Sequence, residues 1–149
     1  MDQIEEFRYL VLAVQREGNR VFAARLRPLG ITPAQSEVLR VLAERQPLSM
    51  SDLGELLICE SSGSPSRLVD RLVASGHVSR DPGEDRRSVR LQLTESGERI
   101  AEQIGAAEGE LYAALEPALR GQPLDATLQT LRSVAAGSSA GRALARRIG

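Results

Sequence analysis

The stretch PSRLVDRLVASGHVSRDPGEDRRSVRLQLTESG, residues 65–97, carries the pattern that decides the fold. It begins with a proline after Ser64 and keeps apolar residues three or four apart until Gly76, which predicts a short amphipathic helix. Apolar and polar residues then alternate over 89–93, which predicts a strand with one buried face. Because residues 81–84 read DPGE, a turn composition, we expect this strand to be the second of a β-hairpin.

Three helices are predicted before this stretch. Apolar positions three, four and seven apart mark a helix over residues 3–27. Thr32 followed by Pro33 opens a second helix, and Ser49 caps a third, short one. Small residues at 60–64 separate this helix from the next. Two helices joined by such a break and followed by a hairpin predict a winged helix-turn-helix.

Two more helices are predicted after the hairpin. Thr94 caps a long helix that we expect to end or kink at Pro117. Leu124 lies near the start of a last helix, and the conformation of residues 137–149 stays open. The expected fold class is therefore mainly α with a small β-hairpin wing, that is, a winged helix-turn-helix with N- and C-terminal dimerisation helices.

The chain of 149 residues is expected to form a single domain. Residues 32–97 would make the winged helix-turn-helix lobe. The helices over 1–31 and 98–149 are too long and too apolar to serve that small core alone. Their remaining apolar stripes are expected to pair with a second copy of the chain, giving a homodimer.

Composition limits the classes of function. With 42% hydrophobic and 26% charged residues the chain is expected to fold, and the formal net charge of -1 argues mildly against non-specific binding of nucleic acid. All 19 cationic residues are arginines, whose planar guanidinium suits phosphate and guanine. One cysteine, an N-terminus without a signal-peptide pattern and no apolar run of membrane-spanning length predict a cytoplasmic protein without a membrane partner.

Enzyme motifs are not recognised. We find no G-x-G-x-x-G, no P-loop and no paired histidines, and we expect no strand-to-helix G-x-S-x-G elbow. His77 is the only histidine, and a zinc site needs three or four ligands, so this residue is expected to have a structural role at the start of a strand. The chain is therefore not expected to be an enzyme, and no catalytic residue, metal or cofactor is predicted.

The predicted contacts with double-stranded DNA form two groups. The second helix of a helix-turn-helix enters the major groove with its N-terminal residues at the base edges. Its expected contacts are small and hydroxyl-bearing residues and two arginines: Ser61, Ser62, Ser64, Pro65, Ser66, Arg67 and Arg71. At the hairpin tip Asp85 and Arg87 are two apart, so the carboxylate can brace the guanidinium for the minor groove, with Arg86 between them.

The same residues, 65–97, resemble the MarR family. They match its pattern of a recognition helix ending in DRL-x-x-x-G, a strand with a hydrophobic residue before Arg, a D-x-R wing tip and LT-x-x-G. The resemblance implies that Asp85 braces Arg87, that Arg87 enters the minor groove and that Arg71 contacts the DNA backbone. It further implies a homodimer on a pseudo-palindromic operator, usually a repressor and often released by a phenolic or other small organic ligand. His77 departs from the commoner Leu, Tyr or Trp.

Two alternatives stay open. One is a winged-helix protein–protein adaptor without DNA binding, which the intact wing tip and the helix arginines disfavour. The other is a regulator that senses oxidants through Cys59, which lies between the two helices of the DNA-reading pair. The competing interpretation of Cys59 is a buried small apolar residue, and the neighbouring Glu60 would raise the pKa of its thiol.

Overall fold

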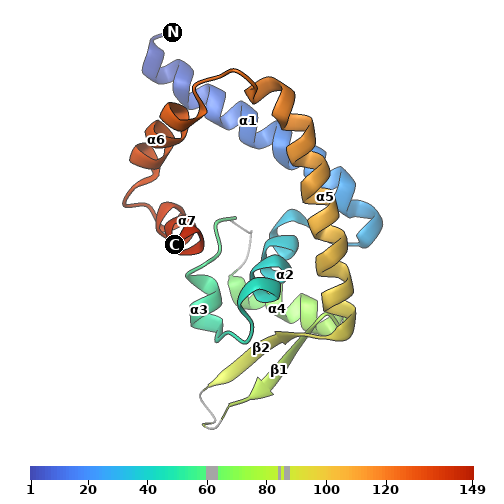
Figure 1. Ribbon diagram of the computed structural model, residues 1–149. Coiled ribbons are helices and arrows are strands. Elements are labelled where there is room, and N and C mark those ends of the chain that lie inside the picture. Colours follow the sequence, from blue (N-terminus) through green and yellow to red (C-terminus); the bar gives the residue numbers. More distant parts are fainter. Residues whose placement is uncertain (60–63, 84, 86–87) are drawn as a thin grey trace.

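The computed structural model describes residues 1–59, 64–83, 85 and 88–149 (Figure 1). Its elements follow in the order α1 (Gln3–Leu26), the 3-10 helix η1 (Arg27–Leu29), α2 (Pro33–Arg45), α3 (Met50–Gly54), α4 (Pro65–Ala74), β1 (Val78–Pro82), β2 (Val89–Leu93), α5 (Glu95–Leu119), α6 (Leu124–Ala135) and α7 (Ser139–Ile148). The predicted fold class is confirmed: the protein is mainly helical, with one antiparallel hairpin. None of the helices in the described ranges is both long and apolar enough to cross a membrane.

Helices α2, α3 and α5 begin where the sequence predicts, because a threonine or a serine caps each of them. Thr32 and Gln35 form a reciprocal capping box, with bonds of 3.0 and 3.2 Å between each side chain and the other residue's backbone N–H. Ser49 and Thr94 each accept a bond of 3.0 Å from the backbone N–H three residues further on. At the end of α4, Gly76 has φ +83°, a left-handed conformation that favours glycine. Local chemistry thus fixes these boundaries.

The first strand of the hairpin extends further than predicted. Asp81 and Pro82, expected in the turn, belong to β1 and pair with residues of β2. The strand can include Pro82 because this residue ends an outer strand, where a missing N–H costs little. The turn itself begins at Gly83, whose N–H donates to the Ser88 carbonyl at 2.8 Å. Glu84, the last predicted turn residue, lies outside the described residues.

The C-terminal third ends its long helix close to the predicted position. α5 includes Pro117, where an end or kink was expected, and ends two residues later, at Leu119. Proline removes only the one bond that its own N–H would make to the preceding turn, so the helix can finish its last residues. The segment left open, 137–149, contains α7, which Ser138 caps by accepting a bond of 2.9 Å from Gly141 N–H.

The core lies around α2. This helix contacts α4, α5 and β2, and its Val38, Leu39 and Leu42 are completely buried. Leu48, just after α2, exchanges backbone bonds of 3.2 and 2.7 Å with Leu91 and so adds one bridge to the edge of the hairpin. In Figure 1 α1 and α5 lie on one side of this lobe and the hairpin extends on the other. The core therefore holds α4 and the hairpin in fixed places on one lobe.

Candidate nucleic-acid interface

Helix α4 divides into a buried and an exposed side. Leu68, Val69 and Leu72 are buried in the core, whereas Arg67 and Arg71, one turn apart, are exposed. This follows from the spacing of apolar residues by three and four along a helix. The two guanidinium groups are therefore presented together, away from the lobe.

The start of α4 carries hydroxyl groups. Ser64 stands at the N-cap position but makes no capping bond with its side chain; its Oγ lies 2.8 Å from Ser66 Oγ, and both residues are exposed. Pro65 occupies the first helical position, as predicted. Hydroxyls at a helix N-terminus can donate to phosphate oxygens or base edges. Of the DNA contacts predicted for this helix, those that the structure describes therefore lie at its N-cap and in its first two turns.

The wing tip is described only in part. Asp85 is exposed, and its carbonyl accepts bonds from Ser88 N–H and Ser88 Oγ at 3.0 and 3.1 Å. Four predicted contacts lie outside the described residues: Ser61, Ser62, Arg86 and Arg87. The brace between Asp85 and Arg87 therefore stays a prediction.

An ion pair that the sequence reasoning missed joins the helix to the hairpin. Arg80 of β1 donates to the carboxylate of Asp70, which lies on α4 between the two exposed arginines. Partly exposed pairs add little stability, so its main effect is to orient the two elements and to neutralise an acid beside the exposed arginines. Both residues belong to the stretch 65–97. Because they are ten residues apart and a helix end lies between them, the sequence alone does not indicate that they pair.

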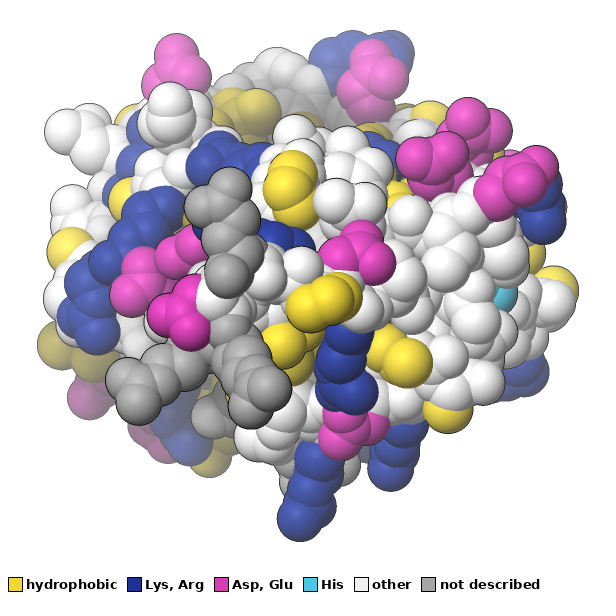
Figure 2. All heavy atoms as spheres, turned by 90° about the horizontal axis from the view of Figure 1, so that it is seen from below, with side chains coloured by type: hydrophobic (Ala, Val, Ile, Leu, Met, Phe, Trp, Pro, Cys, Tyr) yellow, Lys and Arg dark blue, Asp and Glu magenta, His cyan; other side chains and the backbone are white. Residues whose placement is uncertain are grey.

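The charge on this side of the molecule is mixed. Figure 2, seen from below, shows dark blue and magenta side chains interspersed instead of one continuous basic surface. Residues 64–92 contain six arginines and four acidic residues. A broad positive field is therefore weak here, and affinity for DNA would depend on where individual arginines are held.

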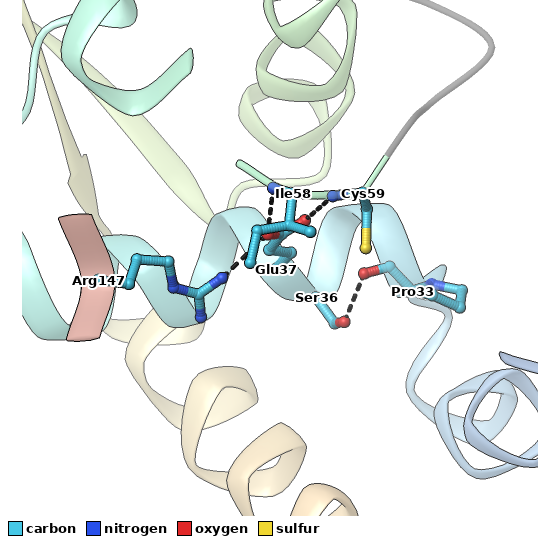
Figure 3. A network of polar contacts seen from close by, with 6 residues as sticks. All are labelled: Pro33, Ser36, Glu37, Ile58, Cys59 and Arg147. Atoms are coloured by element: carbon cyan, nitrogen blue, oxygen red, sulfur yellow. Dashed lines mark hydrogen bonds and ion pairs between the residues drawn. The ribbon is translucent and has the colours of Figure 1, made fainter. Parts of the chain in front are cut away.

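Cys59 is exposed, so the interpretation as a buried small apolar residue is wrong. It follows α3, its backbone N–H donates to Glu37 of α2 at 2.8 Å, and its sulfur points towards the start of α2 (Figure 3). Partial burial, and then the Glu37 carboxylate, raise the pKa of the thiol to about 12. Glu60, to which the sequence reasoning gave this effect, lies outside the described residues. A protonated thiol reacts slowly with oxidants, which argues against redox sensing.

His77 sits where β1 begins and bonds to the start of α5. Its Nδ1 lies 2.8 Å from Ser96 Oγ, and its carbonyl accepts a bond of 3.1 Å from Thr94 N–H. These contacts fit the structural role predicted for it. In the described ranges, no three His, Cys, Asp or Glu side chains are grouped as metal ligands would be.

The letters GSSAG at residues 137–141 do fit the G-x-S-x-G pattern of serine hydrolases. That motif needs a sharp turn between a strand and a helix, with a base beside the serine. Here the segment joins two helices, α6 and α7, and Ser139 is the first residue of α7. The chain's one histidine, His77, is bonded to Ser96 at the base of the hairpin instead. The pentapeptide is therefore a helix connection.

Comparisons with known proteins agree with this geometry. A family model described as MarR family matches residues 29–88. The HTH-type transcriptional regulator FarR of Neisseria gonorrhoeae is 37% identical over 95 residues, which cover 63% of this chain and 64% of that protein, so the match spans less than two thirds of that relative.

Solved structures match over more of the chain. The reduced form of MarR from E. coli is 30% identical, with a TM-score of 0.68, and the match covers 85% of this chain and 93% of that one. A mutant MarR from E. coli, crystallised in complex with operator DNA, is 29% identical with a TM-score of 0.76, and the match covers 90% and 99% of the two chains. The similarity extends well beyond the helix-turn-helix.

Proposed function

The chain belongs to the MarR family of transcriptional regulators, and we propose that it binds double-stranded DNA as a homodimer on a pseudo-palindromic operator. The proposal rests mainly on the orientation of helix α4: Arg67 and Arg71 are exposed, while the opposite side of the helix is buried in the core. The pair between Asp70 and Arg80 supports it, because it orients the wing relative to that helix. Further support comes from the similar mutant MarR that was crystallised with operator DNA.

Each predicted contact has a role in this proposal. The start of α4 enters the major groove, where Arg67 reaches a base edge or a phosphate and Arg71 grips the backbone. The wing then enters the neighbouring minor groove with Arg87, which Asp85 orients. The remaining contacts, from the segment before α4, its first turn and the wing, are Ser61, Ser62, Ser64, Pro65, Ser66 and Arg86.

The homodimer rests on apolar side chains that the chain leaves uncovered. The terminal helices α1, α5 and α6 expose large apolar residues, among them Ile4, Leu10, Val14, Leu115, Leu119, Leu124, Leu128, Leu131 and Val134. Such a set marks an interaction surface. We assign residues 32–97 to DNA reading and residues 1–31 and 98–149 to dimerisation. Two recognition helices about 34 Å apart would then meet successive major grooves.

We further propose a repressor that a small organic ligand, such as a phenolic compound, releases from DNA in the cytoplasm. The ligand would bind where α5 leaves the DNA-reading lobe. There Arg40 of α2 bonds to Glu108 of α5 at 3.1 Å, and the exposed Tyr112 follows one turn further along α5. If a panel of simple phenolic acids leaves the DNA affinity unchanged, this part of the proposal fails.

Fluorescence anisotropy of labelled duplexes at several salt concentrations tests the function. A dimer that neutralises about four phosphates should lose affinity about 100-fold between 50 and 200 mM salt, because counterions are released on binding. A protein–protein adaptor would show little duplex affinity at any ionic strength, and that result would overturn the proposal.

A further inference from the structure

Glu37 is a buried carboxylate outside the predicted DNA contacts. It lies in α2, and its side chain is only 8% exposed. Figure 3 shows three donors converging on it: Ile58 N–H and Arg147 Nη1 reach Oε1 at 2.6 and 2.9 Å, and Cys59 N–H reaches Oε2 at 2.8 Å. A carboxylate is costly to bury unless its oxygens are bonded and its charge is paired. Here both conditions hold, and the partners come from two distant parts of the chain.

The first two donors belong to the segment that leads into the recognition helix. Ile58 and Cys59 follow α3 and precede Pro65, where α4 begins, by only six or seven residues. The end of α3 also packs closely on that start, since a Cβ added at Gly54 would lie 3.8 Å from Pro65 Cγ. Because α3 contacts α4, a displacement of Ile58 and Cys59 that also moves the end of α3 would reach the N-terminal end of α4.

The third donor belongs to the C-terminal helix α7, which is docked on the lobe at its end. Arg45 of α2 donates to the carbonyls of Arg146 and Arg147 at 3.0 and 3.1 Å, in the last turn of α7. Arg146 in turn pairs with Glu55, just after α3, at 3.3 Å. Because α7 follows α6, with its exposed leucines, these contacts connect the proposed dimerisation helices to the helix-turn-helix.

We propose that Glu37 is a positioning residue for DNA recognition and that α7 controls it through Arg147. The inference rests on the proposed function. Arg147 supplies the counter-charge beside the buried Glu37 carboxylate, whose two oxygens accept from the backbone amides of Ile58 and Cys59. When α7 leaves, the unpaired carboxylate turns towards solvent, the segment at 58–59 is released, and the start of α4 loses its fixed position. Changes in the dimerisation helices would thereby reach the DNA-reading helix.

The test uses the full chain and two duplexes of equal length: one selected by the wild-type protein from a random library, and a scrambled version of it. Arg147→Gln is expected to lower affinity for the selected duplex about tenfold, within the range of coupling energies between sites, and to leave the scrambled duplex unchanged. Glu37→Gln should behave likewise, because its amide NH₂ would face a backbone donor. Arg147→Lys should restore most of the selective affinity, since Arg147 uses a single nitrogen here.

Arg142→Gln is the matched control. This arginine lies on the same helix but bonds to the Gly137 carbonyl instead of the lobe, so its replacement should leave selectivity unchanged. Hydrogen exchange gives a second measure: the amides of Ile58 and Cys59 should exchange faster in Arg147→Gln, while those of α2 stay protected. If Arg147→Gln and Glu37→Gln select DNA as the wild type does, or lose affinity for both duplexes equally, the inference is wrong. A wild-type chain without salt-dependent duplex affinity would instead overturn the proposed function, and the inference with it.

Discussion

The helix-turn-helix lobe and the terminal helices contain the same kinds of apolar residue and bury them very differently. Within the lobe, Leu42, Leu53, Leu72 and Leu91 are 0% exposed. In the terminal helices, leucines at the same helical spacing face solvent, and α6 contains no buried residue at all. The lobe therefore buries its apolar residues within one chain, whereas much of the apolar surface of the outer helices is left uncovered by it. This contrast is the basis for assigning DNA reading to the lobe and dimerisation to the outer helices in the proposed function.

The largest effect should come from truncating the lobe's core. Leu42→Ala removes a completely buried side chain from α2, and it should lower the free energy of unfolding by about 2–5 kcal/mol, because a cavity remains. Urea denaturation followed by circular dichroism measures this loss. Gln15→Ala, at an exposed position of α1 outside the apolar set assigned to the dimer, is the control and should cost under about 0.5 kcal/mol. Equal losses in the free energy of unfolding for the two variants would contradict the difference in burial between the lobe and the outer helices.

The next effect concerns the uncovered helix. Replacing Leu128 and Leu131 together by Glu puts charges on the apolar side of α6. It should raise the dimer dissociation constant by at least about 100-fold, since each buried leucine stabilises an interface by about 1.5–3 kcal/mol. Sedimentation velocity would follow the shift towards the mass of one chain, 16.1 kDa. Gln129→Glu adds one charge to another side of the same helix and should leave the dimer intact. A wild-type mass of one chain would disprove the dimer outright.

A smaller change should separate DNA reading from folding. Arg87→Ala is expected to weaken binding to a selected duplex by about 1–3 kcal/mol, the value of one good arginine contact, with no change in thermal stability. Arg99→Ala serves as its control, because that arginine pairs with Glu95 on α5, away from the wing. Wild-type affinity in Arg87→Ala would refute the role given to the wing.

The smallest effect is expected at Cys59. Its raised pKa means that the reactive thiolate forms only as the pH approaches about 12, so at pH 8 the folded chain should be alkylated by iodoacetamide at least about tenfold more slowly than the urea-unfolded chain. Cys59→Ser should bind DNA like the wild type, both before and after peroxide treatment. If peroxide releases DNA from the wild type but not from Cys59→Ser, redox sensing through Cys59 would be supported instead.

Most of the fold could be predicted from the sequence because its signals are local. Thr32 and Thr94 cap the helices that follow them, and Gly76 ends α4. Pro117 indicated the end of α5 to within two residues, because a proline removes one bond to the preceding turn.

The contacts that hold the candidate site together could not be predicted in the same way. Arg147 and Glu37 are 110 positions apart, and Arg40 and Glu108 are 68 apart. Neither pair belongs to a motif, and a charged residue on a helix has many possible partners until the helices are packed. Cys59 shows the same limit: its surroundings depend on Glu37, 22 residues earlier, and on α7.

The most direct test of the whole account is the mass of the complex between the wild-type chain and a selected duplex, measured by sedimentation at low salt and again at high salt. For a DNA-binding homodimer we expect two chains per duplex at low salt, and we expect the complex to dissociate steeply as salt is added. One chain per duplex, or no complex at any salt concentration, would contradict it.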